Sequence, residues 1–477
     1  MRSQEIALVF CTHHWHNPAM SDAHTSTIPP HKQAQWSHIW HLSWPIMISN
    51  LSQPLVGAAD TAMMGHLPDP AGIGGVALGT LVVHFIVMLF SFLRMSTTAL
   101  TSQAYGKRDE AAILRPLQRG LMIGLGAGLI ALLAHDPLIS LSLIFLPASD
   151  AVEGYMVDYI AIQLFALPAI LMNTALLGWL YGLQSMRIGM VQLLLVNGLN
   201  ILLNFVFVLG FDAGIQGVAL ASVIANWVGL VCILPFVHRH FARYLAGFFR
   251  LRDALTRGGW RAYASLSRDI LIRTLLLYLV EAILLSSGGK TGDVALASLQ
   301  VTMVIFFMIA YALDGFAHAS EALVGTAVGR DDKALLSQTI WRATSLAFLV
   351  SLIITAFLWI AKPVILSLLT SQSEVIAYMD GLWFYVLLLA PLSVLAFQMD
   401  GIFIGAALGH ALRNSMMISF TTFVGSLWLF GYFGDAPLAF PAGALDGVVI
   451  AFILYLAMRG ISLTWFLPQL YRRLSTV

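Results

Sequence analysis

The sequence is dominated by continuous apolar segments that are long enough to cross a lipid bilayer. A membrane-spanning helix needs about 20 apolar residues, and the 477-residue chain has room for twelve of them. Only 10% of the residues are charged, against about 25% in an average soluble domain. The apolar runs are continuous and do not alternate with polar residues, which excludes a transmembrane β-barrel.

We therefore predict an all-α integral membrane protein with twelve transmembrane helices. The expected spans are residues 40–67, 72–95, 119–146, 153–184, 186–210, 215–238, 268–288, 295–323, 340–369, 376–409, 413–432 and 443–467.

Composition also excludes several functional classes. Lys and Arg (25) nearly equal Asp and Glu (24), so no basic surplus is present to neutralise the phosphates of a nucleic acid. Two cysteines are too few for a disulfide scaffold or a cysteine-built metal site. No glycine-rich phosphate-binding loop with its lysine is present, so we expect that ATP is not the energy source. We also expect no cofactor and no metal.

Positive charges give the orientation in the bilayer. Loops on one side hold most of the Lys and Arg residues, among them Lys107, Arg250 and Arg330, whereas the opposite side receives only Lys290 and Lys362. This asymmetry predicts that both termini are in the cytoplasm, and we expect a multi-pass protein of the inner (plasma) membrane.

The two halves of the chain resemble each other at an offset of 223 residues. Matched pairs include Gly106 with Gly329, Lys107 with Arg330, Asp109 with Asp332, Pro168 with Pro391, Gly178 with Gly401 and Gly182 with Gly405. We predict a flexible polar tail (1–35), an N-lobe of six spans (36–238), a cytoplasmic linker (239–267) and a C-lobe of six spans (268–470). Such a parallel repeat places the substrate path between the halves and favours alternating access.

One acidic residue lies inside the first apolar span. Asp60 is about seven residues from the outer end of the span, or about 10 Å deep, and Gln53 shares its helix face. A carboxylate at the bilayer centre costs about 2.5–3.5 kcal/mol. A carboxyl that binds a proton at one face and releases it at the other is what a proton-coupled carrier needs. The alternative is a carboxylate that caps a helix broken at Pro45 and Pro54.

Amide side chains in the fifth span lie at a similar depth. Asn197, Asn200 and Asn204 form one stripe of the helix at spacings of three and four residues, and Ser222 of the sixth span lies at a comparable depth. We expect a buried polar patch around Asp60. The alternative is that these side chains only join helices by hydrogen bonds, worth about 0.6 kcal/mol each.

The second half carries its own acids. Glu281 and Asp400 lie within apolar spans, and the pair could bind a cation such as sodium. Three further polar residues follow a helical stripe that we expect to be a solvated helix end: Asp314, His318 and Glu321. Arg94, near the inner end of the second span, is expected to extend towards the membrane surface.

Three segments resemble one transporter family. Residues 44–67 read WPIMISNLSQPLVGAADTAMMGHL, residues 92–98 read FLRMSTT, and residues 103–106 read QAYG. With these motifs the sequence resembles the MATE family of multidrug and toxic compound extrusion transporters, in particular its DinF-like branch. The resemblance covers about residues 36–470.

This resemblance implies a V-shaped pair of six-helix lobes that exports amphipathic and cationic drugs, as a monomer in the lipid bilayer, in exchange for H⁺ or Na⁺. It implies that Asp60 is the coupling acid and that the first helix bends near Pro45, as a hinge, after protonation. Asn200 and Asn204 match the polar pair of the fifth span, where family members often have an acid at the second position.

The resemblance also implies supporting roles elsewhere. Asn173 and Ser222 match hydrogen-bonding positions in the fourth and sixth spans. Glu281 and Asp400 are similar to the C-lobe acids of sodium-coupled members, which makes them the alternative cation site.

We therefore predict a proton-coupled multidrug antiporter that confers antibiotic resistance and is not an enzyme. The alternatives are a sodium-coupled drug antiporter and a flippase for lipid-linked oligosaccharides. The flippase would favour a cationic cavity, whereas the predicted spans carry few buried Arg or Lys. A membrane-embedded enzyme would depend on His318 and Glu321, which lack a nucleophile.

Overall fold

The computed structural model describes residues 34–65, 70–432 and 444–474. Within these ranges every regular element is a helix, which confirms the predicted all-α fold. The expected tail falls almost wholly on residues 1–33, outside the described residues.

The first half of the chain forms ten consecutive helical elements. They are α4 (Trp36–Met64), α5 (Ala71–Leu89), α6 (Phe92–Lys107), α7 (Glu110–Leu133), α8 (His135–Phe145), α9 (Asp150–Gln163), α10 (Leu167–Gly182), α11 (Met186–Asn204), the π-helical turn η2 (Phe205–Gly210) and α12 (Gly214–Leu245).

The second half forms six long helices after the short helix α13 (Leu251–Ala254). They are α14 (Arg257–Thr291), α15 (Asp293–Gly329), α16 (Lys333–Leu369), α17 (Ser373–Gly405), α18 (Gly409–Leu429) and α19 (Ala444–Arg473).

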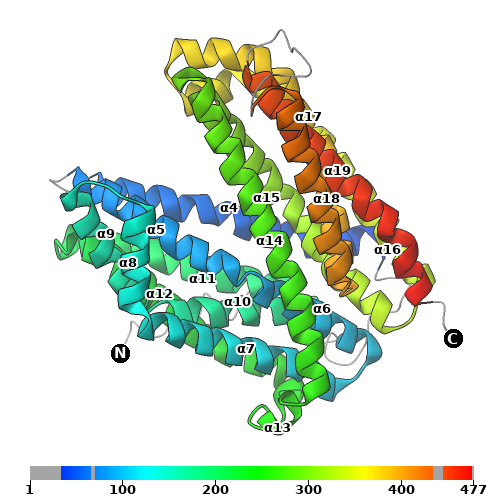
Figure 1. The fold of residues 1–477 in the computed structure, drawn as a ribbon. Helices are drawn as coiled ribbons and strands as arrows, with labels where there is room; N and C mark the ends of the chain where they lie inside the picture. The colour runs from blue at the N-terminus through cyan, green and yellow to red at the C-terminus, as the bar shows by residue number, and fades with distance from the viewer. Residues whose placement is uncertain (1–33, 66–69, 433–443, 475–477) are drawn as a thin grey trace, which may run out of the picture.

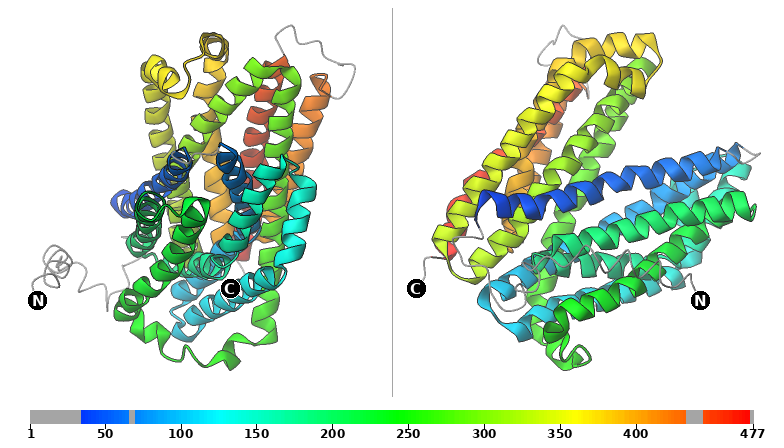
Figure 2. Two further views of the ribbon diagram at one scale, coloured as in Figure 1. Left: turned by 90° about the vertical axis from the view of Figure 1, so that its left-hand side faces the viewer. Right: turned by 180° about the vertical axis from the view of Figure 1, so that it is seen from behind.

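The two halves form the arms of a V (Figures 1 and 2). Helices α4–α12 make the N-lobe and α14–α19 make the C-lobe, and α4 packs against both α11 of its own lobe and α15 of the other. The arms converge where α6 meets α15, close to the C-terminus, and diverge towards the opposite ends of the helices. We call the convergent end the apex.

Hydropathy confirms most of the expected spans. In the described part of the chain, nine helical segments are long and apolar enough to cross a membrane, and the bent pair α9–α10 makes a tenth. At 1.5 Å per residue, α4 (29 residues) and α18 (21 residues) are also long enough. The count of twelve rests on length alone for these two helices.

The boundaries of some elements differ from the sequence predictions. The third span, expected over 119–146, ends at Leu133, and His135–Phe145 forms the separate helix α8. The fourth span bends by 55° between α9 and α10, where Pro168 occupies the first turn of α10 and cannot donate a backbone hydrogen bond. The expected linker 239–267 is largely helical, because α12 continues to Leu245 and α14 begins at Arg257.

The 223-residue repeat reappears in backbone detail. Positive φ angles occur at Arg108 (57°) and its counterpart Asp331 (57°), and at Gln184 (59°) and its counterpart Ala407 (53°). Asp109 accepts a hydrogen bond from the backbone N–H of Ala112 and so caps α7. Asp332 caps α16 in the same way through Leu335. The two halves therefore share turn and capping geometry as well as hydropathy.

Close helix packing follows the same repeat. A Cβ atom added at Gly178 would lie 2.4 Å from the carbonyl oxygen of Arg94, and one added at Gly401 would lie 2.2 Å from that of Ala317. Arg94 and Ala317 are themselves 223 residues apart. Glycine is required at both positions because backbone meets backbone there.

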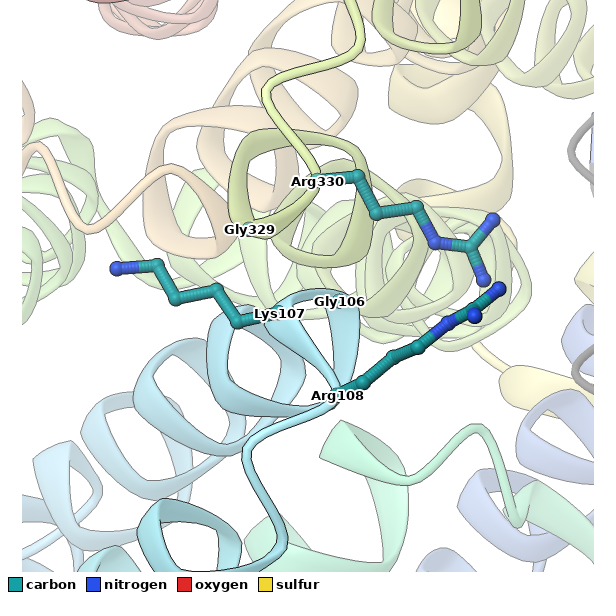
Figure 3. Close-up of a pocket in the computed structure, with 5 residues that line it drawn as sticks. All are labelled: Gly106, Lys107, Arg108, Gly329 and Arg330. Carbon is teal, nitrogen blue, oxygen red and sulfur yellow. The ribbon is translucent and has the colours of Figure 1, made fainter.

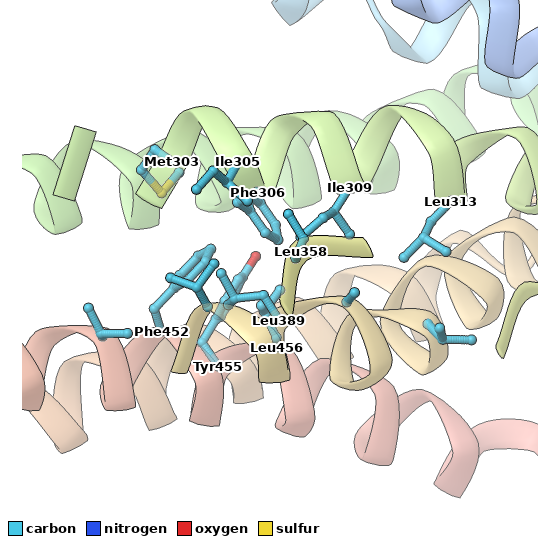
Figure 4. Close-up of a cluster of buried hydrophobic side chains, with 14 of the residues drawn as sticks. Met303, Ile305, Phe306, Ile309, Leu313, Leu358, Leu389, Phe452, Tyr455 and Leu456 are labelled. Carbon is cyan, nitrogen blue, oxygen red and sulfur yellow. The ribbon is translucent and has the colours of Figure 1, made fainter. Parts of the chain in front are cut away.

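The C-lobe has a large apolar core between α15, α17 and α19 (Figure 4). Phe306 of α15 meets Phe452 of α19 edge to face, with ring centroids 5.0 Å apart. Tyr455 and Leu456 continue the same side of α19 and are almost fully buried. This packing makes the C-lobe a firm support for the polar groups that α14, α17 and α19 bring together.

Candidate functional site

Asp60 of α4 contacts a chain of polar side chains in the N-lobe. Asn204 of α11 donates its Nδ2–H to Oδ1 of Asp60 at 2.5 Å, and the same Nδ2 lies 3.4 Å from Oδ1 of Asn200. Asn200 in turn donates to Oγ of Ser222 on α12 at 2.8 Å. The structure thus brings together four of the residues that the sequence singled out.

The end of α11 positions this network. Asn200 and Asn204 lie one turn apart and are both buried, and the helix passes directly into the π-helical turn Phe205–Gly210. Single π-turns inside α-helices are frequent at functional sites. Asp60 itself is half-buried, so the carboxyl group is held by the protein without being sealed inside it.

Two further predicted residues bind elsewhere in the N-lobe. Asn197 donates to Oγ of Ser52 at 2.7 Å. Asn173 donates to the backbone carbonyl of Asn226 at 3.0 Å, and its Oδ1 accepts a hydrogen bond from Gln192 at 3.0 Å. These contacts join α4 to α11 and α10 to its neighbours, so Asn197 and Asn173 support the lobe without touching Asp60.

The remaining predicted residues of the first span do not join the network. Gln53 is exposed on α4. Pro45 is buried, and α4 is one continuous helix through both Pro45 and Pro54. The structure therefore shows the first helix in a single state in which neither proline ends it.

A tyrosine that sequence reasoning missed lies near the carboxyl group. Tyr159 of α9 interacts electrostatically with Asp60, and its hydroxyl accepts hydrogen bonds from Thr80 at 3.1 Å and from Gln163 at 2.9 Å. The two donors hold the phenol in place. An isolated tyrosine in an apolar span gives no sequence signal of this kind.

The C-lobe holds a different carboxylate arrangement. Oδ2 of Asp400 on α17 accepts hydrogen bonds from Nη2 of Arg273 on α14 and from Nη2 of Arg459 on α19. All three residues are almost fully buried. Glu281 follows Arg273 by eight residues on α14, about 12 Å along the helix. The structure therefore pairs Asp400 with two arginines, and does not place it with Glu281 as the sequence suggested.

These arginines also correct the expectation that the spans carry few buried positive charges. Arg273 and Arg459 are 6% and 4% exposed. Each guanidinium leaves its Nε without a hydrogen-bond acceptor among the described residues. Their signal in the sequence was an arginine inside an apolar run, where a charged residue is rare and is paired or functional.

An ion pair connects the lobes. Arg94 of α6 donates to Oε2 of Glu321 on α15 at 3.1 Å, and Nδ1 of His318 lies 3.5 Å from the same oxygen. Glu321 is 0% exposed. The expectation of a solvated helix end at Asp314, His318 and Glu321 was therefore wrong, and so was the expectation that Arg94 extends to the membrane surface.

The helices cross in backbone contact near the apex. A Cβ atom at Gly106 would lie 2.3 Å from the carbonyl oxygen of Thr326, and one at Gly329 would lie 2.1 Å from that of Gln103. The two contacts exchange under the 223-residue offset, so a pseudo-twofold axis passes between α6 and α15. Gln184 adds a hydrogen bond to Oγ1 of Thr326 at 2.9 Å.

Metal-ligating side chains do not gather in the described ranges: no group of three or more His, Cys, Asp or Glu residues there could hold a metal ion. The carboxylates described above instead contact amide, guanidinium or imidazole groups.

Known proteins share both the sequence and the fold. The MatE family model matches the chain twice, over residues 45–206 and 270–433, which agrees with the internal repeat. DNA damage-inducible protein F of Escherichia coli (strain K12) is 37% identical over 428 residues, which cover 89% of this chain and 90% of that protein. The probable multidrug resistance protein NorM of Acinetobacter baylyi is 26% identical over 382 residues, covering 77% and 81% of the two chains.

A solved structure described as the outward-facing conformation of a multidrug resistance MATE family transporter superposes with a TM-score of 0.80. It is 20% identical and the match covers 92% of this chain and 96% of that one, so it shows the shared fold. The two family matches and the E. coli relative together show that this chain belongs to the MATE family of multidrug and toxic compound extrusion transporters.

Proposed function

We propose that the protein is a proton-coupled antiporter that exports amphipathic, cationic compounds by alternating access. The observation that carries this proposal is the setting of Asp60. Its carboxyl group accepts a hydrogen bond from the neutral amide of Asn204 and forms no ion pair within the described part of the chain.

A carboxyl group in this setting can take up and release a proton without separating a buried ion pair. In the ionised state it accepts the Asn204 N–H, and in the neutral state its own O–H can donate to an oxygen. Protonation therefore changes which hydrogen bonds join α4 to α11. Asn200 and Ser222 continue this chain of hydrogen bonds to α12, so the change reaches a third helix.

The arrangement of the lobes supports alternating access. The apex, where Lys107 and Arg330 lie, carries residues of the basic loops, so we assign it to the cytoplasmic side with both termini in the cytoplasm. The divergent ends then face outwards, and the ion pair between Arg94 and Glu321 closes the path near the cytoplasm. The inner membrane and a monomeric state belong to the same proposal.

The N-lobe network favours a proton over sodium. A sodium ion needs several oxygen ligands, whereas Asn204 directs its NH₂ group at Asp60. The C-lobe alternative is also weakened, because Asp400 already binds Arg273 and Arg459 and leaves Glu281 as a lone carboxylate. The same pairing weakens the flippase alternative, since Asp400 offsets one of the two positive charges that would attract a pyrophosphate.

Transport into liposomes tests the proposal. The full chain is reconstituted with an imposed pH gradient in sodium-free buffer, and a fluorescent cationic dye is followed with and without a protonophore. We expect dye movement that stops when the protonophore dissipates the gradient and that is absent in Asp60→Asn. Movement only after a sodium gradient is added would overturn proton coupling, and no movement with either gradient would overturn drug export.

Glu281→Gln serves as the matched control, because it removes a carboxylate from another membrane-spanning helix. We expect this variant to transport at the wild-type rate in the sodium-free assay. Equal loss in Asp60→Asn and Glu281→Gln would contradict the assignment of coupling to the N-lobe.

A further inference from the structure

A hollow of about 370 Å³ lies at the apex, where the two halves of the chain meet (Figure 3). It is lined by Gly106, Lys107, Arg108, Gly329 and Arg330. In Figure 3 the side chains of Arg108 and Arg330 extend to the same side and bring their guanidinium groups close together, while Lys107 points the other way. Two positive groups from different lobes therefore converge at one point.

The guanidinium group of Arg330 is incompletely hydrogen-bonded at this hollow. Arg330 follows the last residue of α15, and its Nε and Nη2 are buried with no acceptor among the described residues. It also forms no ion pair in that part of the chain. Burial lowers the pKa of the Arg330 guanidinium, and the positive charge of Arg108 adds to this effect. The guanidinium remains charged at neutral pH. An anion in the hollow would therefore supply the missing hydrogen-bond acceptors and offset the repulsion between Arg330 and Arg108.

Two neighbouring carboxylates, Asp332 and Asp109, cap the helices that follow them. Asp332 interacts electrostatically with Arg330, but its Oδ1 accepts the backbone N–H of Leu335 at 2.8 Å and caps α16. Asp109, which follows Arg108, accepts the N–H of Ala112 at 3.0 Å and caps α7. Asp332 and Asp109 each therefore direct one carboxylate oxygen towards a helix end.

The pseudo-twofold axis shows that this concentration of positive charge is specific to one side. The axis relates Lys107 to Arg330 and Arg108 to Asp331. One side of the junction therefore combines Arg108 with Arg330, whereas the equivalent side combines Lys107 with Asp331, which have opposite charges. The repeat alone does not require two converging guanidiniums, because the matched position in the other half is an aspartate.

We propose that Arg108 and Arg330 bind a phosphate group between the two lobes, supplied by the headgroup of an anionic phospholipid of the cytoplasmic leaflet. Paired guanidiniums match the geometry of phosphate oxygens and form strong charge-assisted hydrogen bonds. Both residues directly follow the ends of helical segments that are long and apolar enough to cross a membrane, so in our proposal they lie at headgroup level. Anionic lipids of the cytoplasmic leaflet are attracted to basic residues at this position.

The bound headgroup would hold the lobes together at the apex, because one arginine belongs to α6 and its connection and the other to α15. It would therefore stabilise the state that is closed on the cytoplasmic side. This inference rests on the proposed assignment of the apex to the cytoplasmic side, whereas lipid binding at the junction does not depend on which ion drives transport.

Native mass spectrometry of the purified full chain, titrated with phosphatidylglycerol or with phosphatidylcholine, tests the proposal. We expect wild-type protein to retain phosphatidylglycerol in preference to phosphatidylcholine, and Arg330→Gln to bind it roughly tenfold more weakly, as expected for the loss of a charged hydrogen bond. The control Lys362→Gln, which removes a positive charge near the far end of α16 and outside the hollow, should bind like wild type. Equal retention by Arg330→Gln and wild type would overturn the site.

A second variant tests the site independently, in case Arg330→Gln does not fold. Arg108→Asp copies the charge pattern of the equivalent side, where Asp331 accompanies Lys107, and should remove the lipid preference while the protein remains folded. Inorganic phosphate is titrated in parallel by thermal unfolding in lipid-free detergent. A stabilisation by phosphate that needs Arg330, without any preference for phosphatidylglycerol, would overturn the lipid as the source of the anion.

Discussion

The two lobes hold their membrane carboxylates in opposite ways. In the N-lobe, Asp60 is half-buried and accepts a hydrogen bond from the neutral Asn204. In the C-lobe, Asp400 is 5% exposed and lies between the guanidiniums of Arg273 and Arg459. Asp400 thus has two charged partners, whereas the hydrogen-bond donor to Asp60 is a neutral amide.

An acid in an apolar span of this protein can therefore have either of two uses. Asp400 accepts hydrogen bonds from two buried arginines, of α14 and α19, and so ties three helices of the C-lobe together. Asp60 ties α4 to α11 only through a hydrogen bond that depends on its protonation state. The same chemical group is a structural clamp in one lobe and, in our proposal, a proton carrier in the other.

The largest effect is expected from Asp60→Asn. The amide keeps the size of the carboxyl group and a polar contact with Asn204, but it cannot bind a proton. Dye export in proteoliposomes should fall to the leak rate of liposomes without protein, while the thermal unfolding midpoint stays close to that of the wild type. Export at the wild-type rate would contradict the assignment of proton coupling to Asp60.

Asp400→Asn should act on stability. Breaking a buried ion pair costs about 3–5 kcal/mol because the remaining charge is left uncompensated, and here two guanidiniums are left. We expect a marked drop in the unfolding midpoint in detergent. The triple variant Asp400→Leu/Arg273→Met/Arg459→Met should recover much of it, since apolar replacement of a buried ion pair is often nearly neutral. A stable Asp400→Asn protein without transport would instead make Asp400 a second coupling acid.

A third buried acid, Glu321, pairs with Arg94 of the other lobe. Arg94→Gln leaves Glu321 buried without its positive partner, at a cost of about 1–3 kcal/mol, and should favour separation of the lobes at the apex. Distances between spin labels on α7 and α16 near the apex measure this shift. Glu321→Gln should give a similar shift, and the double variant should be less affected than the sum of the two. Additive shifts would mean that the two residues do not act as a pair.

Asn204→Ala should have a smaller effect than these. It removes the hydrogen bond to Asp60, and a loss of about 1.4 kcal/mol corresponds to tenfold in rate or affinity. We expect transport to fall by roughly that factor. Asn197→Ala is the matched control, because Asn197 binds Ser52 and not Asp60, and its loss should cost only about 0.6 kcal/mol. Equal effects of the two substitutions would show that Asn204 is no more than a helix contact.

The sequence predicted what depends on spacing along one helix or on the repeat. Asn200 and Asn204 are four residues apart and therefore share a helix face, and their depth matched that of Asp60. The equivalence of Gly178 and Gly401 in the repeat could be predicted from the 223-residue offset alone. These features follow from helical periodicity and from equal span lengths, which a single sequence contains.

Contacts between distant helices could not be predicted in the same way. Arg273 is 127 residues from Asp400 and Arg94 is 227 residues from Glu321, and nothing in the periodicity of either segment states which faces meet. Hydropathy alone also predicted a third span that continues beyond Leu133, because α8 is as apolar as the helix before it. Rotation and packing of the helices decide these features.

The glycine crossing of α6 and α15 makes each lobe a long lever with its fulcrum at one end. α15 has 37 residues and is about 55 Å long at 1.5 Å per residue, and it crosses α6 in its last turn. A rotation of only about 10° at this crossing would displace the far end of α15 by roughly 9 Å, as the length of a rigid helix implies. Small adjustments at the junction are therefore magnified at the mouth, whereas a large opening near the junction itself requires the two backbones to part.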